Sequence, residues 1–204
     1  MRTRHRAVRK RRHTFGHGEH PAILGVDMSG RPFDWLKWEE AVRHYVLEQV
    51  GWTVGEPSSV IFGGYGKGGE RSHLDLHPVI AIRGADASSL ETQVPTLSRH
   101  SLFARDQNTC MYCGKEFPVH QLTFDHIIPR SKGGRNMWTN AATSCRRCNT
   151  HKSNKTLEES GLVLLAIPYE PNYAESLILR NRAILADQMA FLKARVPNVR
   201  KYLY

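Results

Sequence analysis

The 204-residue sequence lacks long hydrophobic runs. Its longest apolar run, residues 162–167, is too short to span a bilayer, and no apolar stretch follows the basic N-terminus as a secretory signal would require. Internal repeats are also absent from the sequence. We therefore expect a soluble, cytoplasmic protein that has no membrane partner.

The sequence has no unpaired cysteine. All four cysteines fall in two Cys-x-x-Cys pairs, Cys110 with Cys113 and Cys145 with Cys148. In a secreted chain such pairs could form two disulfides, whereas in a reducing compartment four thiolates at this spacing form a closed tetrahedral site for Zn²⁺. We favour the zinc site, and we expect the ion to be structural and to take no part in catalysis.

Acidic residues are absent from the beginning of the chain. Residues 2–12 carry seven basic side chains, and the whole chain has a formal net charge of +10, which indicates a polyanionic partner. With almost no apolar residue, residues 1–20 cannot pack a core, so we expect a disordered basic tail. The tail could contact the DNA backbone or could add only solubility. A mitochondrial transit peptide is less favoured because an apolar face is missing.

Residues 21–95 predict a small α+β region. A strand from Ala22, a turn at residues 29–32, a helix and a second strand are expected in this order, with a further strand over residues 76–82. Large apolar side chains recur at helical spacing, which is more typical of a core than of base stacking. These side chains are Trp35, Trp38, Val42, Tyr45 and Val46.

A glycine-rich stretch, residues 63–69, superficially resembles a loop that binds phosphate. It lacks the Gly-Lys-Ser/Thr ending of such a loop and opens no helix, so we expect a flexible loop over residues 55–75. Residues 86–96 then predict a linker.

After the second cysteine pair, residues 161–204 predict a strand and an amphipathic helix. The apolar run 162–167 indicates a short strand that ends before Pro168. Beyond it, apolar residues at helical spacing alternate with basic ones, so the helix either packs on the rest of the protein or dimerises. The apolar positions are Leu177, Ile178, Ile184, Leu185, Met189, Leu192 and Val196.

The segment between the two cysteine pairs carries the chemistry. Asp125 offers a hard oxygen ligand, and the adjacent His126 can take a proton near neutral pH. A Gly-Gly turn at Gly133 and Gly134 follows, and Asn140 lies beyond it. An oxygen ligand for a metal next to a general base indicates a nuclease site.

In order, spacing and residue type, residues 105–155 resemble the HNH endonucleases, in their cysteine-containing branch. The resemblance rests on Asp125 to Pro129, Ser131 to Gly134, Asn140, Cys145 to Asn149, and Lys152. It implies a ββα-metal fold, in which the first strand of a hairpin carries Asp125 and His126 and zinc clips a helix to the hairpin. Asn149 stands where the family usually has histidine.

The resemblance also implies roles for residues of the catalytic site. His126 resembles the general base that takes a proton from the attacking water, and Asp125 with Asn149 resembles the pair that holds one Mg²⁺ or Mn²⁺ ion. Asn140 resembles the asparagine that braces the hairpin and orients the histidine. Two protein oxygens leave most ligand positions to water and phosphate, which suits these two ions. The expected products have 5′-phosphate and 3′-hydroxyl ends.

Basic side chains around this segment predict contacts to the phosphates of DNA, with double-stranded DNA as the expected partner. They are Arg105, Lys132, Arg146, Arg147 and Lys152. For each of them, the alternative is a solvated position on the surface.

We thus predict an α+β protein with a ββα-metal core. It comprises a basic tail (1–20), an N-terminal α+β region (21–95), an HNH nuclease domain (96–160) and a C-terminal strand and helix (161–204). A monomer would nick one strand, and paired nicks would require a homodimer. Two alternatives stay open: a zinc-dependent nucleic-acid-binding protein without turnover, and a ribonuclease with the same core.

Overall fold

The computed structural model describes residues 20–181 and 183–203, so residues 1–19 of the predicted basic tail lie outside the described residues. The chain divides into two compact units. Of the described residues, the first comprises 20–86 and 183–188, and the second comprises 87–181 and 189–203. The division after residue 86 precedes the predicted boundary at residue 95. Within the described ranges, no helix combines the length and the apolar character needed to cross a bilayer.

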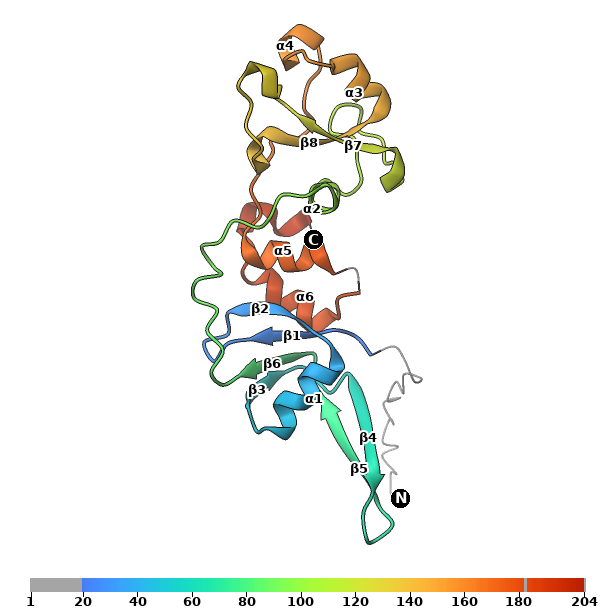
Figure 1. Cartoon of the computed structure of the whole chain (residues 1–204), viewed down its shortest axis with the longest axis vertical. Helices are drawn as coiled ribbons and strands as arrows, with labels where there is room; N and C mark the ends of the chain where they lie inside the picture. The colour runs from blue at the N-terminus through green and yellow to red at the C-terminus, as the bar shows by residue number, and fades with distance from the viewer. Residues whose placement is uncertain (1–19, 182, 204) are drawn as a thin grey trace, which may run out of the picture. The chain divides into compact units, whose positions relative to one another are not determined.

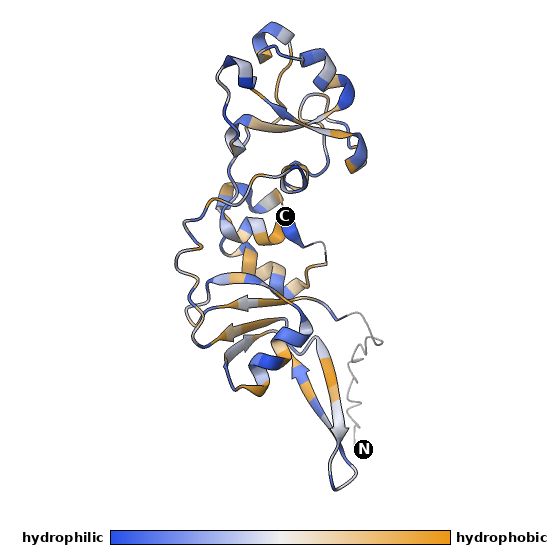
Figure 2. Ribbon diagram, viewed as in Figure 1, coloured by the Kyte–Doolittle hydropathy of each residue, from blue (hydrophilic) through white to orange (hydrophobic). Residues whose placement is uncertain are grey.

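The first unit is built on a four-stranded mixed sheet in the order β2-β1-β6-β3 (Figure 1). Strand β1 (Ile23–Val26) is antiparallel to β2 (Pro32–Leu36) and parallel to β6 (Val79–Ile82). Strand β3 (Val50–Val54) pairs antiparallel with β6. Every residue of β1 and β6 is buried, and Figure 2 shows the apolar residues in these two central strands. Uninterrupted apolar sequences suit strands that are covered on both faces.

Helix α1 (Trp38–Val46) packs its apolar side against the core of this sheet. The helical side chains that contact the core are Trp38, Val42 and Tyr45, as predicted. The prediction for Val46 is wrong, because this side chain is 71% exposed. Trp35 is half-buried but lies on β2 rather than on the helix.

The structure corrects the prediction of a flexible loop over residues 55–75. Strands β4 (Ser59–Tyr65) and β5 (Arg71–Leu76) form an antiparallel hairpin there. At the end of the hairpin near the sheet, the apolar side chains of Ile61, Leu74 and Leu76 pack in the core. At the other end, the N–H of Gly66 donates to the carbonyl of Glu70 (2.8 Å) and closes the turn. Anchoring at one end therefore allows a glycine-rich segment to form strands.

The second unit contains a ββα element. Strand β7 (Leu122–His126) pairs antiparallel with β8 (Ala141–Cys145) in an unbroken register, from Leu122 opposite Cys145 to His126 opposite Ala141. Helix α3 (Arg146–Lys152) begins directly after β8. This confirms the predicted fold class, α+β with a ββα core and a cluster of four cysteines.

Further helices surround the ββα element in the second unit. They are α2 (Arg99–Arg105), α4 (Leu157–Ser160), α5 (Tyr173–Arg180) and part of α6 (Ala186–Lys193). Short 3₁₀ helices span Val119–Gln121, Arg130–Lys132, Trp138–Asn140 and Asn198–Leu203. Helix α2 packs on both hairpin strands and on α5, and its Leu102 and Phe103 share a buried cluster with Leu122 and Trp138.

Residues 162–167 do not form the predicted strand. Leu162 and Leu164 pack against the cysteine cluster, whereas Val163, Leu165 and Ile167 are exposed. The N–H of Leu165 donates to the carbonyl of Met111 (3.0 Å), which belongs to a loop rather than to a strand. The alternation of buried and exposed side chains is strand-like, but no sheet edge lies beside this segment among the described residues.

The single predicted C-terminal helix is divided into α5 and α6. The side-chain oxygen of Gln188 accepts a hydrogen bond from the N–H of Leu185 (2.9 Å), just before α6 begins. Its amide nitrogen donates to the carbonyls of Ala22 (2.7 Å) and Pro78 (2.9 Å) in the first unit. These bonds fix the start of α6, so the segment before it leaves helical geometry.

Candidate functional site

The four cysteines come together at the end of the β7–β8 hairpin where α3 begins. Cys110 and Cys113 lie on a tight loop after α2, Cys145 ends β8, and Cys148 lies in the first turn of α3. Their sulfur atoms all lie within 4.8 Å of one another, and no disulfide joins them. The loop is closed by the N–H of Gly114, which donates to the carbonyl of Cys110 (2.9 Å).

The cysteine cluster fits a zinc ion. Four sulfurs bound to zinc at about 2.3 Å would lie about 3.8 Å apart, so the observed cluster needs only a small contraction. Burial of the Cys110 thiol disfavours its charge, but hydrogen bonds from the backbone of Cys145, Cys113 and Tyr112 outweigh this effect and lower the pKa of Cys110 to about 7. A thiol that ionises this readily is a suitable metal ligand. Burial raises the pKa of Cys113 and Cys148 instead, and a bound cation would favour the thiolate form of both. The geometry supports the zinc site rather than the alternative of two disulfides.

Asp125 is buried and lies between two donors. The hydroxyl of Tyr112 donates a short hydrogen bond to Oδ2 of Asp125, and Nζ of Lys152 lies 3.2 Å from both carboxylate oxygens. The Lys152 amine also donates to the carbonyl of His126 (2.7 Å). Burial, followed by the bond to Asp125 and its charge, raises the pKa of Tyr112, so the hydroxyl stays protonated and acts as the donor.

His126 lies beside Asp125 at the end of β7, but its side chain is half-buried rather than buried. Its ring packs against Phe124, with the ring centroids 5.0 Å apart. Nε2 of His126 lies 3.3 Å from Oδ1 of Asn136, in the loop between the two strands. Adjacent strand positions therefore separate a carboxylate held inside the protein from an imidazole that solvent can reach.

Asn140 ties the connecting loop to the end of β7. Its side-chain oxygen accepts from the N–H of Ile128 (2.8 Å), and its amide donates to the carbonyls of Ile128 (3.1 Å) and Arg135 (2.9 Å). Gly133 has φ +88°, and a Cβ on Gly134 would collide with the carbonyl oxygen of Ile128. The two glycines and Asn140 thus bring the chain back beside His126.

Asn149 is half-buried on α3, three residues before Lys152. Residues three apart on a helix share a face, and Lys152 is in contact with Asp125. Asn149 therefore lies on the side of α3 that faces β7. A carboxylate has about four lone-pair sites, so Asp125 can bind an ion while it accepts from Tyr112 and Lys152. Carboxylate and amide oxygens are the donor types that a hard divalent cation prefers.

The structure corrects two of the predicted phosphate contacts. Lys152 is fully buried in its ion pair with Asp125. The Arg105 side chain is also buried, forms an ion pair with Asp106, and donates to the carbonyls of Trp138 (2.9 Å) and Ala141 (2.9 Å). Neither side chain can reach a phosphate in this conformation, so both have structural roles here.

The other three predicted contacts, Lys132, Arg146 and Arg147, lie on the surface. Lys132 pairs with Glu159 through a bond of 2.6 Å to Oε1, and this pair is partly exposed. Arg146 donates to the carbonyl of His120 (3.2 Å). These side chains are accessible to a substrate.

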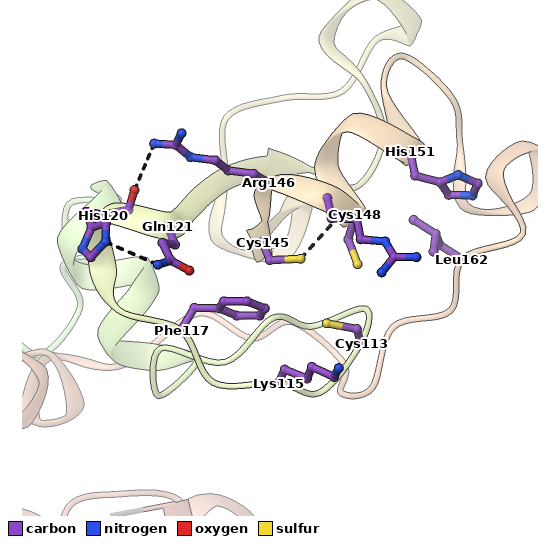
Figure 3. A pocket seen from close by; sticks show the side chains of 11 residues that line it. Cys113, Lys115, Phe117, His120, Gln121, Cys145, Arg146, Cys148, His151 and Leu162 are labelled. Atoms are coloured by element: carbon purple, nitrogen blue, oxygen red, sulfur yellow. Dashed lines mark hydrogen bonds between the residues drawn. The ribbon is translucent and has the colours of Figure 1, made fainter.

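Beside the cysteine cluster lies a cavity of about 930 Å³, drawn in Figure 3. It is lined by three of the cysteines, by the apolar Phe117 and Leu162, and by basic side chains, with no carboxylate among the lining residues. The basic side chains are Lys115, His120, Arg146, Arg147 and His151. Four thiolates around one Zn²⁺ would carry excess negative charge, which these basic groups would offset.

Sequence reasoning missed Tyr112, Asn136 and the cavity residues Lys115, His120 and His151. Tyr112 sits inside the first Cys-x-x-Cys pair, so its position next to two zinc ligands was visible in the sequence. Its contact with Asp125, 13 residues away, depends on the fold. The same holds for Asn136, which reaches His126 across the loop.

Comparison with known proteins gives a family match and structural likenesses of small extent. A family model described as HNH endonuclease matches residues 110–164. Among solved structures, the crystal structure of the type II-C Cas9 enzyme from Actinomyces naeslundii is similar, with 24% sequence identity and a TM-score of 0.28. The likeness covers 52% of this chain and 12% of that enzyme. No curated protein matches the chain.

Proposed function

Because a family model described as HNH endonuclease matches residues 110–164, we propose that this protein is a metal-dependent endonuclease that hydrolyses DNA phosphodiester bonds. The observation that carries the proposal is the arrangement of Asp125, His126 and Asn149 on the ββα element. Asp125 and His126 end β7, and the Lys152–Asp125 contact brings α3, with Asn149, across this strand. In this proposal the carboxylate and the amide would hold the ion, and the imidazole at the end of the same strand would act on the attacking water.

His126 is the proposed general base. Nε2 of His126 lies 3.3 Å from Oδ1 of Asn136, so the loop between the two strands contacts the ring and can hold it in place. The neutral imidazole would take a proton from the attacking water. Asn140 is a positioning residue in this proposal, because it holds Ile128, two residues after His126.

Asp125 and Asn149 are the proposed protein ligands of the catalytic ion, Mg²⁺ or Mn²⁺. When bound there, such an ion stabilises negative charge on the phosphate and on the leaving 3′ oxygen, which yields 5′-phosphate ends. Tyr112 and Lys152 hold the Asp125 carboxylate in one orientation. Hydrogen-bonded ligands of this kind are preorganised for a cation.

The basic cavity beside the cysteines is the proposed binding site for the DNA backbone. Arg146 and Arg147 line it, and Figure 3 shows Lys115 on the loop across from Arg146. Such contacts neutralise phosphates and position a duplex without reading its sequence. One ββα element cuts one strand, so a double-strand break would require two copies of the chain.

Nicking of supercoiled plasmid tests the proposal. Wild-type protein should relax the plasmid with Mg²⁺ or Mn²⁺ and not with chelator. His126→Ala should remain folded and lower the rate by about 10²- to 10⁴-fold, the usual contribution of general-base catalysis. His73→Ala is the matched control, because His73 is an exposed histidine on β5 in the first unit. It should cut like the wild type.

Equal activity of His126→Ala and wild type would remove His126 as the base, and no metal-dependent cleavage of DNA by the wild type would overturn the proposal. An RNA substrate under the same conditions distinguishes a ribonuclease.

One observation favours a second candidate, a zinc-dependent nucleic-acid-binding protein. The basic cavity lies at the Cys145 end of the hairpin, opposite His126, and neither Asp125 nor His126 lines it. In that case both the wild type and His126→Ala would bind DNA in a salt-dependent manner, and neither would cut it.

A further inference from the structure

Tyr112 connects the cysteine cluster to the carboxylate of the proposed catalytic site. It lies in the short loop between Cys110 and Cys113, and its side chain is only 8% exposed. Its ring belongs to the same buried cluster as Cys110 and Cys145, while its hydroxyl donates to Asp125. One side chain therefore contacts both the cysteine cluster and Asp125, near the end of β7.

The position of Tyr112 is set by the residues on either side of it. Cys110 and Cys113 flank it in the sequence, and the N–H of Met111 donates to the carbonyl of Thr143 on β8 (2.8 Å). A zinc ion that binds both cysteines would fix the two ends of this loop. The loop would then hold the Tyr112 ring, and the ring would hold the hydroxyl at a fixed distance from β7.

Asp125 gains a defined orientation from this contact. A hydroxyl that donates to a buried carboxylate makes a charge-assisted hydrogen bond, which is about twice as strong as a neutral one. Lys152 supplies the second donor from α3, at 3.2 Å. Tyr112 and Lys152 approach from different elements, so together they restrict rotation of the carboxylate group.

We propose that Tyr112 is a positioning residue that couples the zinc-binding cluster to Asp125. The hydroxyl orients the carboxylate that holds the catalytic ion, so zinc at the cysteines sets the affinity of a second, separate metal site. This inference rests on the proposed function, since it concerns the same carboxylate. It assigns the zinc cluster an effect on the second site in addition to its stabilisation of the fold.

The variant Tyr112→Phe tests this coupling, because it removes one oxygen and keeps the buried ring. The measurements are zinc content, the Mn²⁺ dissociation constant from paramagnetic relaxation of water protons, and plasmid nicking. We expect one zinc per chain as in the wild type. Residues that support metal ligands typically contribute 10- to 100-fold, so we expect a Mn²⁺ dissociation constant raised by about 10-fold. The Mn²⁺ concentration for half-maximal nicking should rise to a similar extent.

Tyr45→Phe is the matched control. Tyr45 is a half-buried tyrosine, and its hydroxyl lies 3.0 Å from Nδ1 of His77 in the first unit. Its loss should leave zinc content, Mn²⁺ affinity and nicking unchanged. This control separates the loss of a hydrogen-bonded tyrosine hydroxyl in general from the loss of the contact with Asp125.

Two results would overturn the coupling. In the first, Tyr112→Phe retains zinc and binds Mn²⁺ as tightly as the wild type. In the second, Tyr112→Phe loses its zinc, which would make Tyr112 a residue of the zinc fold alone. If the wild type binds Mn²⁺ but cuts no DNA, the proposed function fails, and the Mn²⁺ affinities still decide the role of Tyr112.

Discussion

The two hairpins β4–β5 and β7–β8 are antiparallel ribbons of similar size in very different surroundings. In β4–β5 the register shifts between Phe62 and Tyr65, and these two side chains are 50% and 76% exposed. In β7–β8 the register is unbroken and every residue of β8 is buried. Buried polar groups require partners, and an enclosed hairpin can supply them in fixed positions. A hairpin can thus hold a buried carboxylate only where the surrounding elements cover it and supply hydrogen-bond partners.

Of the features that enclose the β7–β8 hairpin, the cysteine cluster should contribute most to the stability of the second unit. Cys145→Ser removes a ligand at the end of β8, and binding of structural zinc contributes about 10 kcal/mol or more to the folding of small zinc domains. We expect loss of zinc and of the cooperative melting transition of the second unit. Zinc content and thermal unfolding measure this outcome.

Ser144→Ala is a control for Cys145→Ser at the neighbouring position. Ser144 is fully buried, but its hydroxyl donates only to the carbonyl of Cys145 (3.1 Å). This variant should retain zinc. A Cys145→Ser protein with full zinc content and an unchanged melting temperature would show that burial of the β7–β8 hairpin does not depend on the cysteines.

The buried ion pair should have the next largest effect. Lys152→Met leaves the Asp125 charge buried with Tyr112 as its remaining donor, and removal of one partner of a buried pair typically costs about 3 to 5 kcal/mol. Urea unfolding measures this loss. Lys132→Met is the matched control, because the Lys132–Glu159 pair is partly exposed and such pairs contribute about 1 kcal/mol or less. If both variants lose the same free energy of unfolding, burial does not determine how much an ion pair contributes to stability.

The smallest effect is expected in the exposed hairpin. Phe62 contacts Arg71, whose guanidinium carbon lies 5.1 Å from the ring centroid, but half of the Phe62 side chain is exposed. Phe62→Ser should change the free energy of unfolding by about 0.5 kcal/mol and leave nicking unchanged. A large fall in DNA affinity with unchanged stability would instead make β4–β5 a part of the substrate-binding surface.

The same contrast explains what the sequence could predict. The β7–β8–α3 element was predictable because its cysteines, the Asp125–His126 pair and the glycine turn lie close together in the sequence, at characteristic spacing. The β4–β5 hairpin was not, because its glycines weaken the strand signal and its anchoring depends on the core of the first unit. The strand predicted at residues 162–167 failed for lack of a neighbouring edge.

The burial of charged side chains also could not be predicted from the sequence. Lys152 and Arg105 were expected on the surface, as basic residues usually are. The carbonyls of Trp138 and Ala141 satisfy Arg105, and Asp125 satisfies Lys152, across separations of 27 to 36 residues. Local sequence patterns carry no information about such distant partners.

The unequal burial of the four cysteines has a kinetic consequence. Cys110 and Cys145 are buried and Cys148 is half-buried, whereas Cys113 is exposed. A chelator, an alkylating reagent or an oxidant can therefore approach a zinc ion in this cluster from the Cys113 side. Metal exchange would begin with release of that one sulfur while the other three retain the ion, so the lifetime of the zinc complex would depend mainly on the Cys113 bond.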